Sequence, residues 1–365
     1  MATMDKQRRA EFLSRMTGIM NGGALSLMCS IGHKTGLFDT MSTMEPATSH
    51  EIAEAAGLNE RYVREWLAAV SAGGVVDYDA EAGTFHLPPE HAGLLTRASG
   101  PLNLTTYCQY VALLGQVEDE VVTAFREGGG VPYDRYPAFQ TLVAESSGQR
   151  LDKALISQVV PLLPGGYDRL AAGIDVADVG CGSGRALNLL AAEFPQSRFT
   201  GFDIAEHALE RGRAMAAERG LTNIGFEAAD AAQIAHNEEF DLITTFDAIH
   251  DQAKPDTVLK AIFNALRPGG TYLCVEPKAS SHLHENLDLP MAPMMYTIST
   301  MHCMTVSLAY DGDGLGTAWG EQLAIEKLTD AGFVDIQVTG IADDRANNYF
   351  VAAKPGDSAK PGAGA

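Results

Sequence analysis

Three glycines at alternate positions, Gly180, Gly182 and Gly184, lie between an apolar run at residues 174–179 and a predicted helix at 185–193. Glycine adopts backbone angles that side chains forbid, and it lets the backbone approach a ligand closely. The free N–H groups at the start of the following helix can bind an anionic group. The pattern predicts a ligand-binding turn between a buried strand and a helix.

The spacing of this turn separates it from a nicotinamide site. A dinucleotide fingerprint reads G-x-G-x-x-G. Here the turn reads G-x-G-x-G, with Cys181 and Ser183 between the glycines and Asp178 two residues before the first of them. The shifted spacing and the added acid favour S-adenosylmethionine as the ligand. Taken alone, the turn also fits a plain connection between a strand and a helix, so the segments that follow decide.

Acids end the next two predicted strands. Asp203 ends the strand at 198–204, nineteen residues after Gly184, and Asp230 ends the strand at 224–230. An acid at the end of the second strand accepts hydrogen bonds from ribose hydroxyls in dinucleotide folds. Asp230 is placed for an adenine amino group. The residues that complete the predicted cofactor site are Ile204, Ala231, Phe246 and Asp247.

Strands and helices alternate through the second half of the chain. A fourth strand is predicted at 240–247, a helix ends at the stop signal of residues 267–270, and a fifth strand follows at 271–276. This alternation predicts an α/β fold with a parallel, doubly wound sheet that binds ligands at the carboxyl ends of its strands.

A base for methyl transfer is predicted at the end of the fourth strand. Displacement at a sulfonium requires alignment of the acceptor and then its deprotonation. His250 lies at the rim where the transferred methyl group is expected, and its imidazole can take the proton of a hydroxyl or thiol. The alternative is a surface or helix-capping histidine. His302 is a second candidate, as base, substrate contact or packed core residue.

The order of these parts resembles the class I S-adenosylmethionine-dependent methyltransferases over residues 150–355, with 334–341 and 348–353 similar to the family's closing strands. The resemblance implies a Rossmann-like, seven-stranded methyltransferase domain preceded by a mainly α winged-helix dimerisation domain. The whole chain most closely resembles a bacterial group of winged-helix methyltransferases that is well represented in mycobacteria. The segments that carry this resemblance are residues 48–95, 128–133, 178–184, 248–251, 302–303 and 319–321. Members of that group are often assigned only by fold, so the resemblance names no acceptor.

Residues 248–251 also resemble the plant O-methyltransferase pattern in which the histidine is the general base, followed by an aspartate, here Asp251. Two acids orient the histidine in those enzymes. Glu276, after the fifth strand, matches one of them, and Glu321 is a looser match for the other. Gln252 replaces the aromatic residue that follows in the plant pattern, which leaves the contacts to the cofactor and the acceptor type open.

Two segments are predicted to contact the substrate. Tyr133 and Tyr136 follow a glycine-rich run at 128–132, where a mobile lid would need a hinge and aromatic surface. The segment 291–304 contains five methionines, whose flexible side chains suit an adaptable pocket. Its candidate contacts are Met295, Tyr296, His302 and Cys303. The alternative for both segments is ordinary packing, of the bridge between domains or of the core.

Residues 48–97 have the pattern of a winged helix, but their charge opposes DNA binding. The chain has a formal net charge of −21, whereas DNA phosphates are met by lysine and arginine. From Asp39 to Arg97 there are ten acids and three arginines. We therefore expect this domain to pair two subunits, as the resemblance implies. A cofactor-sensing regulator that binds DNA is the rival interpretation.

Length and composition predict an intracellular protein of several parts. The 365 residues exceed a single core, and the expected division is 1–100, a helical bridge and lid at 101–166, the methyltransferase domain at 167–354 and a disordered tail at 355–365. Five scattered cysteines favour reduced thiols and no metal site. The basic start before the apolar run 16–32 resembles a signal peptide, but polar residues and glycines interrupt it, and no run reaches the length of a membrane span.

Together these features predict a cytoplasmic, homodimeric methyltransferase that uses S-adenosylmethionine and acts on a small molecule, with oxygen as the expected acceptor atom. Methyl transfer to sulfur or nitrogen is the alternative within the same enzyme class, and a nitrogen acceptor would not require a base.

Overall fold

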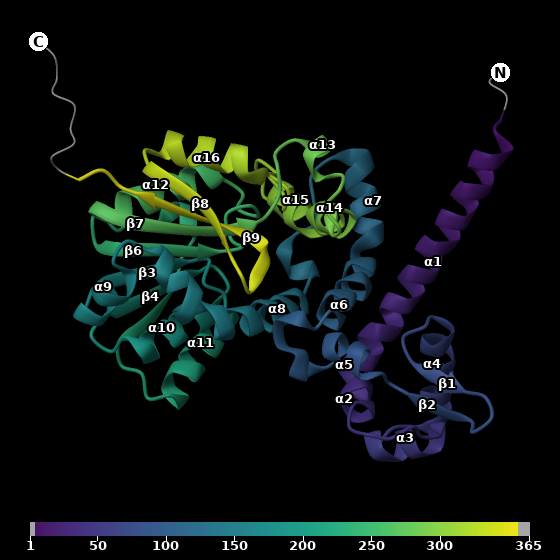
Figure 1. Ribbon diagram of the computed structural model, residues 1–365. Helices are drawn as coiled ribbons and strands as arrows, with labels where there is room; N and C mark the ends of the chain where they lie inside the picture. The colour runs from purple at the N-terminus through teal and green to yellow at the C-terminus, as the bar shows by residue number, and fades with distance from the viewer. Residues whose placement is uncertain (1–3, 357–365) are drawn as a thin grey trace, which may run out of the picture. The chain divides into compact units, whose positions relative to one another are not determined.

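The computed structural model describes residues 4–356, which form two compact units that divide between Gln116 and Val117 (Figure 1). The predicted bridge at 101–166 is therefore split. Its first helix, α6 (Thr105–Leu114), packs against α1 (Lys6–Thr35) within the amino-terminal unit. Residues 357–365 of the expected tail lie outside the described residues. Lys354 is buried, and its ammonium donates to the carbonyl of Leu266 at 2.7 Å.

The amino-terminal unit contains the expected winged helix. Thr48 and Glu51 form a capping box that starts α3 (Ser49–Ala56), and Gly57 ends it with φ +66°. Asn59 caps α4 (Glu60–Ala72) by accepting a hydrogen bond from the backbone N–H of Arg61. The wing is a short antiparallel hairpin. Its two strands are β1 (Asp77–Asp79) and β2 (Thr84–His86). The unit also contains α2 (Leu37–Met41), α5 (Pro89–Leu95) and the 3₁₀ segment Arg97–Leu102.

One core holds this unit together. Trp66 of α4 packs edge-on against Phe38 of α2, with ring centroids 5.2 Å apart, and its indole N–H donates to the carbonyl of Met28 in α1 at 2.8 Å. Much of the rest of α1 is exposed. Among the described residues, no helix is long and apolar enough to span a membrane.

The carboxy-terminal unit is built on the predicted seven-stranded sheet. The strands are β3 (Asp175–Val179), β4 (Arg198–Asp203), β5 (Ile224–Ala228), β6 (Phe240–Phe246), β7 (Leu266–Pro277), β8 (Val334–Ile341) and β9 (Asp344–Ala353), in the order β5-β4-β3-β6-β7-β9-β8. The first five of these run parallel, and β9 is antiparallel to β7 and to β8. The order reverses between β3 and β6, which is the point where sheets of this type bind ligands.

Helices cover both faces of the sheet (Figure 1). The helices α9 (Gly166–Ala172) and α10 (Arg185–Glu193) pack on one face, and α12 (Pro255–Ala265) and α16 (Gly320–Ala331) pack on the other. The remaining helical segments are α7 (Glu118–Glu127), η3 (Tyr133–Arg135), α8 (Phe139–Ala154), η4 (Leu155–Val159), η5 (Val160–Leu162), α11 (Glu206–Glu218), η6 (Ala231–Gln233), α13 (Leu283–Asn286), α14 (Ala292–Ile298), η7 (Ser299–Cys303) and α15 (Met304–Ala309).

The predicted helix stop lies next to the observed boundary, but the strand after it begins earlier than expected. The helix α12 ends at Ala265, just before residues 267–270, and β7 begins at Leu266 instead of Thr271. The start of β7 accommodates the proline and glycines because they pair with Lys354, the residue after β9: the N–H of Lys354 donates to Gly270 O at 2.9 Å, and the N–H of Gly269 donates to Lys354 O at 3.0 Å.

Candidate active site

The glycine turn leaves β3 in a conformation that suits glycine at all three positions. Gly180, Gly182 and Gly184 have φ values of +70°, +56° and +64°. A Cβ atom on Gly184 would lie 2.2 Å from the ring of Phe226, and one on Gly180 would lie 2.7 Å from Cβ of Ala248. A Cβ atom on Gly182 would meet nothing within 4 Å. The outer glycines are therefore required by packing, whereas the middle one faces open space.

Asp203 fastens this turn from the end of β4. Its Oδ2 accepts from the N–H of Gly182 at 2.8 Å, and its Oδ1 accepts from the N–H of Ala205 at 2.8 Å. The neighbouring side chain of Ile204 is 78% exposed. Asp230 caps η6 after β5, because its carboxylate accepts from the N–H of Ala232 and from the side chain of Gln233. The predicted acids thus lie at the carboxyl ends of neighbouring parallel strands.

Asp178 lies buried in β3, immediately before the turn. Burial, with a smaller contribution from the charge of Asp203, raises its pKa to about 7, although a hydrogen bond of 2.7 Å from Thr244 opposes the shift. Burial also raises the pKa of the Cys181 thiol within the turn. A buried carboxyl with this pKa is partly protonated near neutral pH, which makes its charge sensitive to a bound cation.

Asp247, the first residue after β6, has the positive φ of +53°. Its carboxylate accepts from Nη2 of Arg150 at 2.7 Å, and Nε of Arg150 lies 3.3 Å from Asp344 at the start of β9. Burial raises the pKa of Asp247, and the Arg150 guanidinium opposes that rise. Sequence reasoning missed Arg150, because nothing in the sequence of α8 distinguishes this residue from an exposed helical arginine.

His250 and Glu276 form a buried pair beyond the ends of β6 and β7. Nδ1 of His250 lies 2.6 Å from Oε2 of Glu276, and the two side chains are 6% and 1% exposed. Glu276 also accepts from the N–H of Ile249 at 2.9 Å and from the indole of Trp319 at 3.1 Å. These three hydrogen bonds fix the carboxylate, which in turn fixes the tautomer and orientation of the imidazole.

The environment of His250 favours its protonated form. Burial lowers the pKa of His250, but the Glu276 carboxylate and a hydrogen bond with Cys303 outweigh burial and raise the pKa well above 6.5. Burial also raises the pKa of Asp251, the next residue, to about 6, and the charge of His250 opposes that rise. His250 can therefore act as a base only after losing its proton, from the nitrogen that Glu276 leaves free.

A π-helical turn, η7, brings His302 and Cys303 to this site. Cys303 is buried. It forms a hydrogen bond with the His250 side chain and accepts another from the Thr317 hydroxyl at 3.1 Å. His302 is fully buried, stacks on Phe139 with centroids 3.3 Å apart, and meets the edges of Tyr133 and Tyr136. Neither of its ring nitrogens has a hydrogen-bond partner among the residues that the structure describes. Burial, with the nearby charge of His250, lowers its pKa to about 3, so His302 is neutral near pH 7 and is a weak base.

Two family models match this chain. Residues 23–97 match the one described as an Rv2258c-like winged HTH domain, and residues 170–325 match the one described as a methyltransferase domain. Residues 170–325 of the carboxy-terminal unit thus form a methyltransferase domain. The predicted combination of a winged helix with a Rossmann-like, S-adenosylmethionine-dependent methyltransferase domain is thereby confirmed.

Similar proteins agree with this assignment. The demethylmenaquinone methyltransferase of Lactococcus lactis subsp. lactis is 31% identical over 106 residues, which cover 28% of this chain and 42% of that protein. The ubiquinone biosynthesis O-methyltransferase of Shewanella halifaxensis is 32% identical over 114 residues, which cover 30% of this chain and 48% of that protein. This chain thus spans about half the length of the curated relatives that it matches.

Solved structures match the fold over nearly the whole chain. The mitomycin 7-O-methyltransferase MmcR has a TM-score of 0.71 at 16% identity, with 96% of this chain and 100% of that chain covered. Human N-acetylserotonin methyltransferase, solved with S-adenosylmethionine, has a TM-score of 0.62 at 19% identity, with 97% and 99% covered. At these identities the likeness establishes the fold, and the acceptor must be argued from the site.

Several predicted site residues of the methyltransferase domain are placed differently from expectation. Glu321 accepts a hydrogen bond from Asn348 in β9 at 3.0 Å, and Trp319, two residues earlier, makes the contact with Glu276. The start of α16 therefore orients the acid through an indole N–H. Met295 and Tyr296 lie on α14, and the Tyr296 hydroxyl accepts from the side chain of Asn286 at 2.9 Å.

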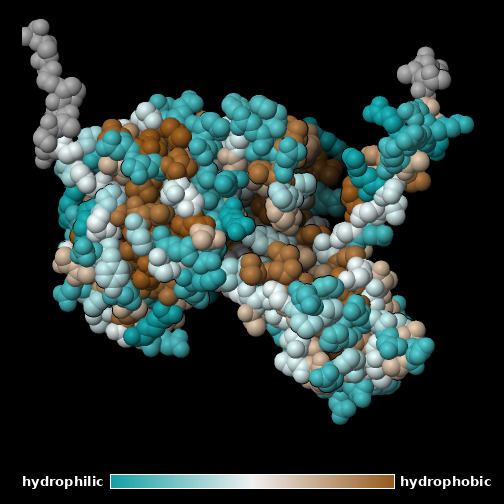
Figure 2. Space-filling view, in the orientation of Figure 1, coloured by the Kyte–Doolittle hydropathy of each residue, from teal (hydrophilic) through white to brown (hydrophobic). Residues whose placement is uncertain are grey.

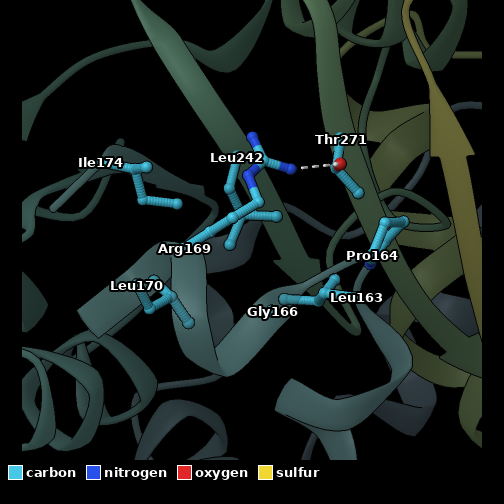
Figure 3. A pocket seen from close by; sticks show the side chains of 8 residues that line it. All are labelled: Leu163, Pro164, Gly166, Arg169, Leu170, Ile174, Leu242 and Thr271. Atoms are coloured by element: carbon cyan, nitrogen blue, oxygen red, sulfur yellow. Dashed lines mark hydrogen bonds between the residues drawn. The ribbon is translucent and has the colours of Figure 1, made fainter. Parts of the chain in front are cut away.

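The methyltransferase domain also contains a small cavity, which none of the candidate site residues lines. It encloses about 10 Å³ between α9 and the starts of the central strands, where Arg169 faces Thr271 (Figure 3). A space of that size holds at most about one water molecule. It is a packing defect at the edge opposite the glycine turn.

Proposed function

We propose that this protein transfers the methyl group of S-adenosylmethionine to a hydroxyl oxygen of a small molecule, with His250 as the general base. The observation that carries the proposal is the buried pair of His250 and Glu276, which lies beyond β6, the strand next to the one that leads into the glycine turn. A base at this point can reach an acceptor held against the methyl group.

The residues of the predicted cofactor site fit S-adenosylmethionine, which supplies an electrophilic methyl group when bound. Asp203 is placed to accept hydrogen bonds from the ribose. The exposed Ile204 side chain offers an apolar surface to the adenine, near Asp230 and Ala231. The open face of Gly182 suits close approach of the methionine portion. The other residues of this proposed site are Asp178, Gly180, Cys181, Ser183, Gly184, Phe246 and Asp247.

Proton transfer is assigned to the two residues of the buried pair. Glu276 holds the Nδ1–H of His250 and stabilises the imidazolium that forms when the ring takes a proton. The free nitrogen of His250 meets the acceptor hydroxyl, and Cys303 lies beside it. Asp251 adds negative charge nearby, and Glu321 supports β9 through Asn348.

The acceptor is proposed to bind against the aromatic residues around His302. The unpaired nitrogens of that neutral ring can donate one hydrogen bond and accept another, which suits a polar substituent of the acceptor. Tyr133, Tyr136 and Cys303 are proposed as further contacts, with Met295 and Tyr296, which lie about one helical turn before η7.

We also propose that two copies pair through the amino-terminal unit. Apolar side chains recur along α1 at helical spacing and are exposed, and brown patches interrupt the hydrophilic surface of this helix in Figure 2. They are Phe12, Leu13, Ile19, Met20, Leu27 and Ile31. A second copy of the same helix is an occupant that would cover this stripe.

DNA binding by the winged helix is disfavoured by its ion pairs. Arg61 pairs with Glu65, and Arg64 pairs with Glu60, both within α4. Each arginine that would face a phosphate is thus matched by an acid on the same helix. Binding of duplex DNA at low salt would favour the rival regulator.

Calorimetric binding of S-adenosylhomocysteine to wild type and Asp203→Ala tests the cofactor site. Tight binding by wild type and its loss in the variant would support the proposal, and absence of binding by wild type would overturn it. Screening phenols, acids, thiols and amines then identifies the acceptor atom. Full turnover by His250→Ala at saturating cofactor would refute the assignment of the base.

A further inference from the structure

A buried arginine occupies the ligand-binding edge of the sheet without a role in the proton transfer described above. Arg150 extends from α8, and its side chain is 16% exposed. Its guanidinium bonds Asp247, at the end of β6, and Asp344, at the start of β9. Burial opposes its charge, but the two carboxylates outweigh burial and raise the pKa of Arg150.

The helix that supplies Arg150 also reaches the helix after the glycine turn. Asp152 pairs with Arg185, the first residue of α10, and a Cβ atom on Gly148 would lie 3.0 Å from the Arg185 side chain. The segment 148–152 therefore lies between the start of α10 and the end of β6. That position is the reversal point of the strand order, where sheets of this class bind their ligands.

The two acids that hold Arg150 differ in how firmly they are held. Asp344 is 2% exposed and accepts from the Tyr349 hydroxyl at 2.8 Å and from the Asn347 side chain at 2.9 Å. It contacts Nε of Arg150. Asp247 is 25% exposed, contacts a terminal nitrogen and has a positive φ. Asp344 is thus a fixed anchor, whereas the pair with Asp247 involves the exchangeable end of the guanidinium.

The charges of this edge do not balance among the protein's own groups. Asp178, Asp203, Asp247, Asp251 and Glu276 influence one another electrostatically, and the cations that act on them are Arg150 and His250. The surplus is negative. It suits a ligand that carries both an ammonium group and a sulfonium, together with one carboxylate for the arginine.

We propose that Arg150 binds the carboxylate of the cofactor's methionine portion and that Asp247 binds its ammonium group. The ion pair between the two side chains is then exchanged for two ion pairs with the ligand's zwitterion. Asp344 keeps Nε of Arg150 in place during the exchange, which makes Asp344 a positioning residue. This inference rests on the proposed cofactor and adds the residues that recognise its amino-acid end.

The test compares two ligands by calorimetry. S-adenosylhomocysteine contains the amino-acid portion, and 5′-methylthioadenosine lacks it. Arg150→Met and Asp247→Asn are expected to weaken binding of S-adenosylhomocysteine by about 10- to 100-fold, because each removes a charge-assisted hydrogen bond. Binding of 5′-methylthioadenosine should change by less than about threefold, a loss that stays below one such bond.

Lys153→Met is the matched control. Lys153 lies on the same helix, and its ion pair with Asp343 at 2.9 Å ties α8 to the residue next to Asp344. The control should bind both ligands as wild type does. Arg150→Lys keeps a charge without the planar fork and is expected to lose part of the preference for S-adenosylhomocysteine.

The outcomes separate this inference from the proposed function. Equal weakening of both ligands by Arg150→Met would show that the ion pair is structural and would overturn the inference. Unchanged affinity for S-adenosylhomocysteine in both variants would overturn it as well. If wild type bound neither ligand, the proposed cofactor itself would fail, and the inference would fail with it.

Discussion

His250 and Glu276 lie with Nδ1 and Oε2 2.6 Å apart, and both side chains are almost completely buried. The carboxylate therefore sets both the orientation and the protonation of the imidazole. A base held in this way has one ring nitrogen that Glu276 does not occupy, but it is protonated at neutral pH until the environment or the solvent pH removes its proton.

We expect the turnover number to rise with pH through the raised pKa of His250, because the neutral ring is the base. Glu276→Gln removes the charge that raises this pKa and leaves burial, which lowers it. The rising limb should then move to lower pH, and the maximal rate should fall. Turnover at saturating substrates across pH 5–10 measures this, with the exposed residue Glu326 changed to Gln as control. An unmoved limb would contradict the assignment.

The same pair affects stability with the opposite dependence on pH. Because the folded pKa of His250 is raised, its contribution is fully present below about pH 6.5, the ordinary value, and is lost as pH rises through the raised pKa. The difference in melting temperature between wild type and Glu276→Gln should accordingly shrink with rising pH. A difference that grew with pH would argue against a charged pair.

Binding of S-adenosylmethionine should release protons. Asp178 and Asp251 have pKa values of about 7 and about 6, and a bound cation would lower both. The bound state then holds fewer protons, so affinity should increase with pH from about 5 to 7 and level off above. Binding heats at pH 6.5 in phosphate and Tris buffers measure the release. Heats that do not depend on the buffer would refute it.

His302→Phe should stabilise the protein and weaken acceptor binding. The change keeps the ring stack on Phe139 and removes two buried nitrogens that have no partner. Removing them should raise the free energy of unfolding by about 1–2 kcal/mol. If the acceptor bonds to His302, its KM should rise. His86→Phe is the control, since it removes an unpaired buried ring nitrogen in β2, outside the proposed acceptor site, and should leave the KM unchanged. An unchanged KM in His302→Phe would exclude the contact.

Two glycines of the turn should respond differently to alanine. Gly184→Ala places a Cβ atom 2.2 Å from Phe226 at a positive φ, so the fold should lose stability by more than about 2 kcal/mol. The Cβ atom of Gly182→Ala meets no other atom, so the substitution should cost only about 1 kcal/mol of stability through backbone strain. Because this atom fills the open face of the turn, the variant should bind S-adenosylhomocysteine more weakly. Denaturant unfolding and calorimetry separate the two. Tight binding by Gly182→Ala would contradict close approach of the ligand.

Leu13→Glu should convert a dimer to monomers, because it places a charge in the exposed apolar stripe of α1, where Leu13 is 67% exposed. Ser14→Glu lies on the opposite side of the helix and is the control. Sedimentation equilibrium measures the mass of each. A wild-type protein that sediments as a monomer, or a dimer that survives Leu13→Glu, would refute pairing through this helix.

Regular patterns explain why much of the fold could be predicted. The apolar run before Gly180 and the acid at Asp203 mark strand ends, and the alternation of strands and helices restricts the sheet to a parallel arrangement. The capping residues Thr48 and Asn59 likewise mark helix starts from sequence. By contrast, the start of the fifth strand at Leu266 was missed, because backbone pairing with Lys354, just after β9, extends this strand over a proline and two glycines that locally favour a turn.

The sequence by itself determined the class of domain, the glycine turn and the acids that follow successive strands, because these depend on short-range spacing along one element. Only the tertiary structure decided which side chains meet: Glu276 at His250, Trp319 in place of Glu321, and Arg150 between Asp247 and Asp344. These partners are separated by up to about two hundred residues, and burial, which shifts their pKa values, exists only once the sheet and its helices have assembled.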